Sequence, residues 1–328
     1  MKLILFFLIL ISNVYGISSG CQSNPTCIAC GSFPITKGQI VYHGYLSYGD
    51  GTSQIYLYKF NSNSVTQLSQ PSWNIVDPMN AYFSPDGKKI TFMGVQGGRW
   101  HIFIWTIGDI NPPTNLTQNL PNIGANEDPK FSSDGKSIFI KRNQDIKELV
   151  LDTGDPPTIK DVTNNGTITE ESMPYPAVDG NYIYGTQGAG AAMGVWMVKL
   201  NPLTYTACDT PGNIQTYYPV STPEGYLIYS QWRDAGRHND QLIFKKTCTD
   251  PPLVLGFNDC LSENADATSV NHDFVLFSGT QNSNKYELFL GQISSGRRWT
   301  LDLLNGVNTV KINGQSPNLL GSHYSPFN

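Results

Sequence analysis

Acidic residues recur along this chain at intervals close to 45 residues, and a fold that gathers them would create a site with chemistry. The candidates are Asp77, Glu127, Asp128, Glu171, Glu263 and Asp266. Converging carboxylates can bind a cation such as Ca²⁺ or a cationic peptide group, or catalyse acid–base chemistry on a sugar. The alternative interpretation is that they are solvated loop charges that cap turns.

Imidazole side chains are the second candidate for chemistry, because histidine is the commonest metal ligand in proteins. The chain has five, scattered along its length: His43, His101, His238, His272 and His323. His43, His101 and His272 fall in or beside strand patterns, where a histidine with structural hydrogen bonds is the commoner case. The sequence therefore does not exclude a metal site, but it favours structural roles for these histidines.

Amide and aromatic side chains mark several polar, glycine-rich loops. Gln96, Trp100, Gln187 and Gln281 belong to such loops. Amides both donate and accept hydrogen bonds and aromatic rings stack, so a ring of them suits hydroxyl-rich or peptide ligands. A fifth loop concentrates charge and an indole ring, and its candidates are Trp232, Arg233, Arg237 and His238. Ordinary polar loops are the alternative for any one of these residues.

Motifs of covalent or cofactor chemistry are missing from the sequence. It has no H-E-x-x-H and no P-loop, and its one G-x-S-x-G match, at 16–20, does not follow a strand pattern that would form a nucleophile elbow. The glycine-rich stretch 188–194 departs from the dinucleotide-binding fingerprint by one residue, and no helix pattern follows it. Cys27 and Cys30 form a C-x-x-C pair, but a redox role would require a helix start that lowers the thiol pKa. The sequence therefore predicts no catalytic residue and no organic cofactor.

The elements that must position these residues form a repeat. The phrase Y-F-S-P-D-G-K-K-I-T-F at 82–92 returns as K-F-S-S-D-G-K-S-I-F-I at 130–140, and weaker copies lie at 176–184, 220–229 and 268–277. The equivalent turn residues are spaced 48, 45, 45 and 47 apart: Asp86, Asp134, Asp179, Glu224 and Asn271. Each copy reads as a hairpin, because Gly supplies the positive φ of the turn and alternating apolar residues follow.

Further apolar strand patterns follow each hairpin, for example at 54–58, 101–105, 195–198 and 286–290. Four short strands in about 45 residues are typical of one blade of a β-propeller. The phrase F-S-P-D-G-K-K-I-x-F also closely resembles the WD40-like (PD40) repeat of TolB-type propellers, which prolyl-oligopeptidase relatives share. That resemblance implies six blades, and the chain shows six starts, near Gly38, Asp77, Glu127, Glu171, Tyr217 and Glu263.

The two ends of the repeat region complement each other. The first blade, at 39–43, lacks an innermost strand, and residues 321–326 read as a lone innermost strand. We therefore predict an all-β, six-bladed propeller over residues 38–328, closed by the C-terminal strand so that no sheet edge remains exposed. In this topology the carboxylates precede the innermost strands and, with the polar loops, surround the mouth of the central channel. The resemblance departs from bacterial TolB in one respect, because that protein carries an α/β domain before its propeller and here only the segment 17–37 separates the predicted signal peptide from the first blade.

Composition narrows the function classes. Only 14% of residues are charged, 12% are aromatic, and the chain has 31 Gly and 21 Pro. This excludes a disordered chain and argues against a helical bundle. The net charge is −5 without a Lys/Arg block, so nucleic acid is not an expected partner.

The N-terminus predicts secretion. Residues 1–16 combine a positive start, an apolar run over 3–11 and small residues before a cleavage site, which is typical of a signal peptide. No other apolar run is long enough to span a membrane. A cysteine-containing segment, 17–37, follows. Disulfides are expected among six cysteines: Cys21, Cys27, Cys30, Cys208, Cys248 and Cys260. Two sequons make Asn115 and Asn165 candidate glycan acceptors.

Together these features predict a secreted, non-catalytic binding module, expected to be monomeric. It would recognise an extracellular protein, peptide or saccharide on the channel-mouth face. The alternative is a carbohydrate-active enzyme, a polysaccharide lyase or glycoside hydrolase, which uses the channel carboxylates or histidines. A structural scaffold without any site is a third possibility.

Overall fold

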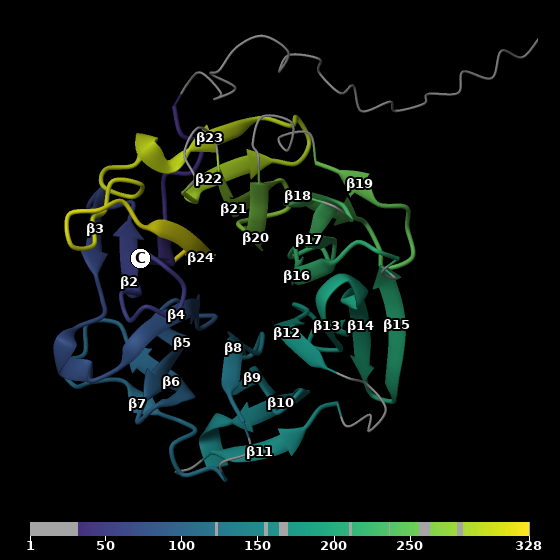
Figure 1. Ribbon diagram of the computed structural model, residues 1–328, viewed down its shortest axis with the longest axis horizontal. Coiled ribbons are helices and arrows are strands. Elements are labelled where there is room, and N and C mark those ends of the chain that lie inside the picture. Colours follow the sequence, from purple (N-terminus) through teal and green to yellow (C-terminus); the bar gives the residue numbers. More distant parts are fainter. Residues whose placement is uncertain are drawn as a thin grey trace, which may run out of the picture.

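The structure is a computed structural model that describes residues 32–121, 124–153, 157–163, 170–209, 212–235, 237–255, 263–280 and 285–327. Six antiparallel sheets of four strands each surround a central axis, as Figure 1 shows. Among the described residues, the helical segments are single 3₁₀ turns of three residues, such as Pro71–Trp73. The prediction of an all-β, six-bladed propeller is confirmed.

Each blade has an innermost strand followed by three strands that lead outward. Blade 1 contains β24 (Asn318–Ser325), β1 (Gln39–Tyr45), β2 (Gln54–Lys59) and β3 (Ser64–Gln67); blade 2 contains β4 (Val76–Phe83), β5 (Lys89–Gln96), β6 (Arg99–Thr106) and β7 (Thr114–Asn115). Blade 3 contains β8 (Asn126–Phe131), β9 (Ser137–Arg142), β10 (Asp145–Val150) and β11 (Thr158–Asp161); blade 4 contains β12 (Glu171–Pro176), β13 (Tyr182–Gln187), β14 (Gly194–Leu200) and β15 (Leu203–Asp209). Blade 5 contains β16 (Thr216–Ser221), β17 (Leu227–Asp234), β18 (Arg237–Lys245) and β19 (Leu253–Val254); blade 6 contains β20 (Glu263–Ser269), β21 (Phe274–Thr280), β22 (Glu287–Gln292) and β23 (Arg298–Thr300).

The repeated hairpin turn owes its geometry to a serine, an aspartate and a glycine. The carboxylate of Asp86 accepts hydrogen bonds from the Ser84 hydroxyl at 2.6 Å and from the Lys88 amide at 3.1 Å. Gly87 has φ +70°, and a Cβ there would lie 2.5 Å from the Ser325 hydroxyl oxygen. Ser132, Asp134 and Gly135 repeat this turn one blade later. The Ser-x-Asp-Gly phrase is therefore a structural signature of the blade.

The ring closes through its C-terminal strand. Strand β24 pairs antiparallel with β1, from Gln39 opposite Ser325 to Tyr45 opposite Asn318, and becomes the innermost strand of blade 1. Figure 1 shows this last strand beside the earliest strands of the chain, next to the central axis. The closure predicted from the sequence is confirmed.

The hydrophobic core lies mostly between blades. One cluster joins Val41 and Ile55 of blade 1 to Phe92 and Phe103 of blade 2. Another joins blade 1 to blade 6 and contains Tyr42, Tyr58, Leu276, Leu288, Leu290 and Leu319. Neighbouring blades bury each other's apolar faces, so each blade depends on a complete ring for its core.

A disulfide joins Cys208 of β15 to Cys248, which follows β18, and so links blades 4 and 5. Disulfides form in oxidising compartments, so this bond agrees with the predicted secretion. Cys21, Cys27, Cys30 and Cys260, like the predicted signal peptide at 1–16, lie outside the described residues.

We expect replacement of both cysteines, Cys208→Ser with Cys248→Ser, to lower the free energy of unfolding by about 3 kcal/mol. The bond closes a loop with a sequence separation of 40, and a cross-link of this span restricts the unfolded chain. Urea unfolding of the variant against the parent protein measures the difference. Equal stability of the two proteins would contradict the link, as would a non-reduced peptide map without a Cys208–Cys248 fragment.

No helix among the described residues is long and apolar enough to cross a membrane.

Candidate functional site

The six innermost strands share one backbone irregularity, a bulge whose residue has φ near +50°. The bulge residues, here called the bulge ring, are Asn80, Asp128, Met173, Tyr218, Asp266 and Gly321. The residues two positions later form a second ring: Tyr82, Lys130, Tyr175, Val220, Thr268 and His323. Because each blade contributes one residue to each ring, chain positions about 45 residues apart meet at the axis.

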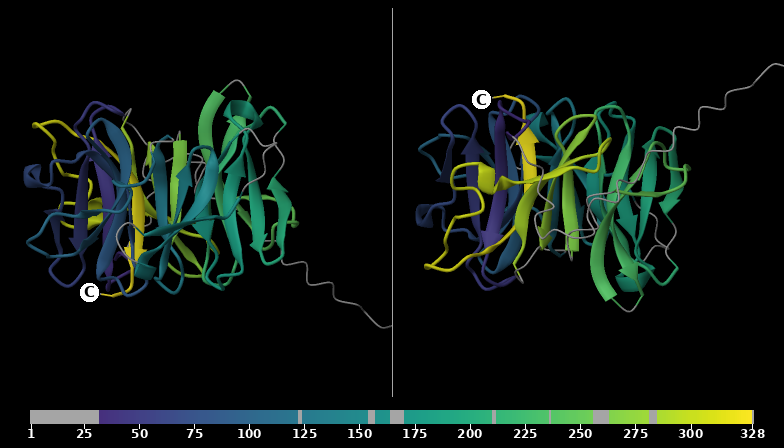
Figure 2. Two further views of the ribbon diagram at one scale, coloured as in Figure 1. Left: turned by 90° about the horizontal axis from the view of Figure 1, so that it is seen from below. Right: turned by 90° about the horizontal axis from the view of Figure 1, so that it is seen from above.

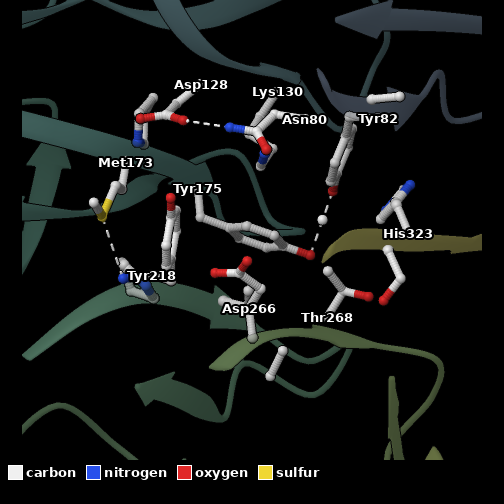
Figure 3. A pocket seen from close by; sticks show the side chains of 17 residues that line it. Asn80, Tyr82, Asp128, Lys130, Met173, Tyr175, Tyr218, Asp266, Thr268 and His323 are labelled. Atoms are coloured by element: carbon white, nitrogen blue, oxygen red, sulfur yellow. Dashed lines mark hydrogen bonds between the residues drawn. The ribbon is translucent and has the colours of Figure 1, made fainter. Parts of the chain in front are cut away.

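The central channel is narrow where these rings line it. This constriction has a free volume of only about 50 Å³, room for a water molecule or two. The hydroxyls of Tyr82 and Tyr175 are joined by a 3.3 Å hydrogen bond across it. The His323 ring stacks on Tyr82 with centroids 3.6 Å apart, and Lys130 Nζ lies 5.2 Å from the Tyr82 ring centroid. Figure 3 shows these four side chains meeting in the channel.

A wider cavity opens above the constriction, on the face where the innermost strands begin. It has a volume of about 370 Å³, and we call it the bowl. Five tyrosines line it: Tyr45, Tyr48, Tyr217, Tyr218 and Tyr286. Four methionines line it too: Met79, Met93, Met173 and Met193. A separate cavity of about 230 Å³ opens on the opposite face. The bowl is therefore a blind, aromatic-walled cavity.

The bowl is strongly acidic. Among the described lining residues, five carry carboxylates, Glu127, Asp128, Glu170, Asp240 and Asp266, and one is a lysine, Lys141. Lys141 Nζ lies 3.0 Å from a Glu127 oxygen and 2.6 Å from a Glu170 oxygen. Both glutamates are thus paired with Lys141 on one wall of the bowl.

Asp128 and Asp266 belong to the bulge ring, on blades 3 and 6. Burial raises the pKa of Asp128, although Lys130 acts in the opposite direction and Asn80 donates a 2.9 Å hydrogen bond to it. Burial, followed by the charge of Asp128, raises the pKa of Asp266 to about 7. The charge of Asp128 thus makes ionisation of Asp266 more costly, whereas the nearby Lys130 favours the ionised form of both carboxylates.

The other predicted carboxylates have structural contacts or lack a described side chain. Asp77, in β4, accepts hydrogen bonds from the backbone amides of Gly51 and Ser53 at 3.1 and 3.2 Å. Glu171 accepts one from Gln187 Nε2 at 3.1 Å, and its side chain is buried. The side chain of Glu263 is outside the described part. Asp77 lies within β4 and Glu171 begins β12, and neither lines the bowl.

Three histidines, His43, His101 and His323, make structural contacts. Nδ1 of His43 and Nδ1 of His323 accept hydrogen bonds from the backbone amides of Asn80 and Phe83, at 3.4 and 3.1 Å. Burial lowers the pKa of His43 to about 3 and that of His323 well below its ordinary value. His101 Nδ1 lies 3.0 Å from the Thr117 hydroxyl, and His272 is exposed. Among the described residues, no group of three or more His, Cys, Asp or Glu side chains is arranged to hold a metal ion.

The predicted loop residues with described side chains do not line the bowl; they are Gln96, Trp100, Gln187, Trp232 and Arg233. Gln96 accepts a 2.9 Å hydrogen bond from Asn115, and Trp100 is half-buried at the start of β6. Trp232 and Arg233 lie in β17, whose hairpin with β18 projects from the ring on the face opposite the C-terminus (Figure 2). Gln281 and the side chains of Arg237 and His238 are outside the described part.

Of the two sequons, only Asn115 is within the described residues. Its side-chain amide donates to Gln96, and its side-chain oxygen accepts from the Thr117 amide at 3.0 Å. Asn165 lies outside them. Glycosylation at either position stays a prediction.

The sequence analysis missed the tyrosines and the two lysines, Lys130 and Lys141. A signal for the bulge ring was present: its members Asn80, Asp128, Met173 and Tyr218 each lie six residues before the turn residue of their repeat. The other tyrosines of the bowl had no comparable signal, because they come from loops and strands at unequal offsets.

No protein-family model matches this sequence, and no curated protein sequence matches it. Solved structures do match its fold. TolB from Acinetobacter baumannii gives a TM-score of 0.65 at 15% identity over 88% of this chain and 66% of that chain. Hydrazine synthase from Kuenenia stuttgartiensis gives 0.67 at 12% identity over 88% of this chain and 46% of that one. A chain of the nidogen/laminin complex gives a TM-score of 0.60 at 9% identity over 87% of this chain and 97% of that chain.

The likeness to TolB confirms the TolB-like propeller inferred from the repeat phrase. The chain spans about two thirds of TolB and less than half of the hydrazine synthase chain. At 9–15% identity the likenesses show the fold alone. A propeller shared by such different proteins does not identify a function, which must be argued from the site.

Proposed function

We propose that this chain is a secreted binding module whose bowl receives a side chain or a terminal group of a peptide, protein or saccharide ligand. The blind, tyrosine-walled cavity at the channel mouth carries this proposal. A cavity of about 370 Å³ suits one projecting group. The Tyr82–Tyr175 hydrogen bond spans the channel below it, which argues against a polymer threaded through the ring.

The contacts of the polar side chains support binding more than catalysis. Asp77 holds a loop, Glu127 and Glu170 share Lys141, and His43 and His323 hold backbone amides. Groups with such structural partners are poorly placed to transfer protons. In contrast, the tyrosines offer ring faces and hydroxyls, which suit recognition of polar ligands.

A carbohydrate-active enzyme is the second candidate, and one observation favours it. Asp266 and Asp128 lie in the same ring, and burial raises the pKa of both, that of Asp266 to about 7. Glycoside hydrolases use a pair of carboxylates, one of which is protonated near neutral pH. Release of reducing ends from a panel of polysaccharides, with loss of activity in Asp266→Asn, would support this candidate.

The cellular setting is part of the same proposal. The signal peptide at 1–16 and the cysteine-containing segment at 17–37 imply export, and the Cys208–Cys248 disulfide is consistent with an oxidising compartment. A monomer with an extracellular partner is the arrangement we propose. Size-exclusion chromatography with light scattering tests the monomer.

A peptide and glycan array with the mature protein tests the proposed binding, and Tyr48→Ala then locates the ligand. Tyr48 is 66% exposed at the rim of the bowl, so its truncation should change stability by less than about 0.5 kcal/mol. We expect about five- to tenfold weaker binding of any array ligand, because a stacked ring contributes about 1 kcal/mol.

Ile110→Ala is the matched control, because Ile110 is an exposed apolar residue in the loop between β6 and β7, away from the bowl. Its affinity should equal that of the parent protein. An array ligand whose affinity is the same in Tyr48→Ala and in the parent protein would contradict binding at the bowl.

A further inference from the structure

We propose that the group the bowl receives is an organic cation that carries N–H donors, namely a primary or secondary alkylammonium group on an extended apolar stem. This inference rests on the proposed function and specifies its ligand chemistry. Two sources share this chemistry, a free polyamine and a lysine side chain on a peptide. Charge, aromatic lining and an unfilled hydrogen-bond acceptor support it independently.

The charge of the bowl favours a cation. Its described lining residues include five carboxylates and one lysine, and that lysine is engaged by Glu127 and Glu170. The effect of the remaining carboxylates reaches the phenols: burial, then the charge of Asp266, raises the pKa of Tyr45 to about 12. Burial, then Asp266 and Asp128, raises the pKa of Tyr218. A bound cation would be stabilised by the field that disfavours these phenolates.

The walls of the bowl suit the stem and the charge of such a ligand. Tyrosine ring faces attract ammonium groups within about 6 Å, an interaction strengthened by desolvation. The fold already shows this contact one ring lower, where Lys130 Nζ lies 5.2 Å from the Tyr82 ring. Methionine side chains adapt to flexible apolar stems, and four line the bowl.

The floor of the bowl offers an acceptor without a donor. Oδ1 of Asp266 is buried and has no hydrogen-bond partner among the described residues. Lys130 influences the Asp266 carboxylate electrostatically but makes no ion pair within 4.0 Å in the described part of the chain. In Figure 3 the Asp266 carboxylate projects into the channel from β20. An N–H-bearing cation would give this oxygen a donor, whereas a quaternary ammonium group would not.

Isothermal titration calorimetry at pH 8 and low ionic strength tests the inference with four probes. Spermidine represents the free amine and acetyl-Gly-Lys-Gly-amide the peptide. Tetramethylammonium lacks N–H donors, and the same peptide with an acetylated lysine lacks the charge. We expect spermidine or the lysine peptide to bind at least about tenfold more tightly than either comparison probe, because charge-assisted hydrogen bonds are strong.

Two substitutions locate the binding. Asp266→Asn should weaken binding of the amine by about tenfold or more, and Tyr48→Ala should weaken it by several-fold. Asp109→Asn removes an exposed carboxylate outside the bowl and should leave the affinity unchanged. Thermal melting of each variant confirms that it is folded. If Asp266→Asn does not fold, Tyr48→Ala still tests whether the amine binds at the bowl.

The outcomes separate this inference from the proposed function. Preference for spermidine identifies a free amine as the ligand, and preference for the peptide identifies a lysine side chain; both support the inference. Failure of both spermidine and the lysine peptide to bind would overturn the inference. It would also be overturned if Asp266→Asn bound the amine as tightly as the parent protein does. If a neutral array ligand still binds and is weakened by Tyr48→Ala, the proposed function stands without the cation.

Discussion

Deletion of residues 316–328 is expected to abolish cooperative thermal unfolding and to cause aggregation. The deleted stretch contains β24, the innermost strand of blade 1, which pairs with β1 from Gln39 to Tyr45. It also removes the buried Leu319 from the blade 1–blade 6 core, and His323 from its stack on Tyr82. The loss exposes the edge of β1 and apolar faces of two blades, and unpaired edges promote association. Circular dichroism melting and light scattering measure both effects.

The matched control removes only residues 327 and 328, beyond the end of β24. Phe327 is half-exposed, so this short truncation should melt within a few degrees of the parent protein. A protein that lacks residues 316–328 and still melts like its parent would show that the ring does not depend on its C-terminal strand.

Asp266→Asn is expected to stabilise the protein at pH 8 by up to about 4 kcal/mol and to have almost no effect at pH 4. An aspartate in the unfolded chain titrates near pH 3.9, whereas burial and then Asp128 raise the pKa of Asp266 to about 7. Between these pH values the native state binds the extra proton, so this residue lowers the free energy of unfolding as the pH rises. The destabilisation by Asp266 reaches its full size above pH 7. A difference of about three units between the native and unfolded pKa corresponds to about 4 kcal/mol.

Urea unfolding at pH 8 and pH 4 measures the effect, with Asp109→Asn as the control at an exposed carboxylate. The control should match the parent protein at both pH values. Equal destabilisation of Asp266→Asn at pH 4 and pH 8 would contradict the raised pKa and indicate a packing role. A carboxylate that costs stability is typical of a functional position, since stability and activity often trade against each other.

The sequence by itself determined the blade and the closure of the ring. Asp86 and Gly87 specify a tight turn through local hydrogen bonds and a positive φ, and both act within a few residues of each other. Strand periodicity and the missing first strand are equally local features, which is why residues 321–326 could be assigned to blade 1. Interactions between residues close together in the chain leave a repeated sequence pattern, so the repeat phrase was enough to predict the blades.

Only the tertiary structure decided which side chains form the site. A bulge breaks the alternation of each innermost strand, so the orientation of Glu127 and Asp128 depends on backbone geometry that the side-chain pattern does not reveal. Glu127 pairs with Lys141 on the wall, and Asp128 faces Asp266 from a blade three positions away around the ring. The Tyr82–Tyr175 bond that spans the channel joins residues 93 positions apart. Such contacts depend on distances between blades, which arise when the blades pack and not from any segment alone.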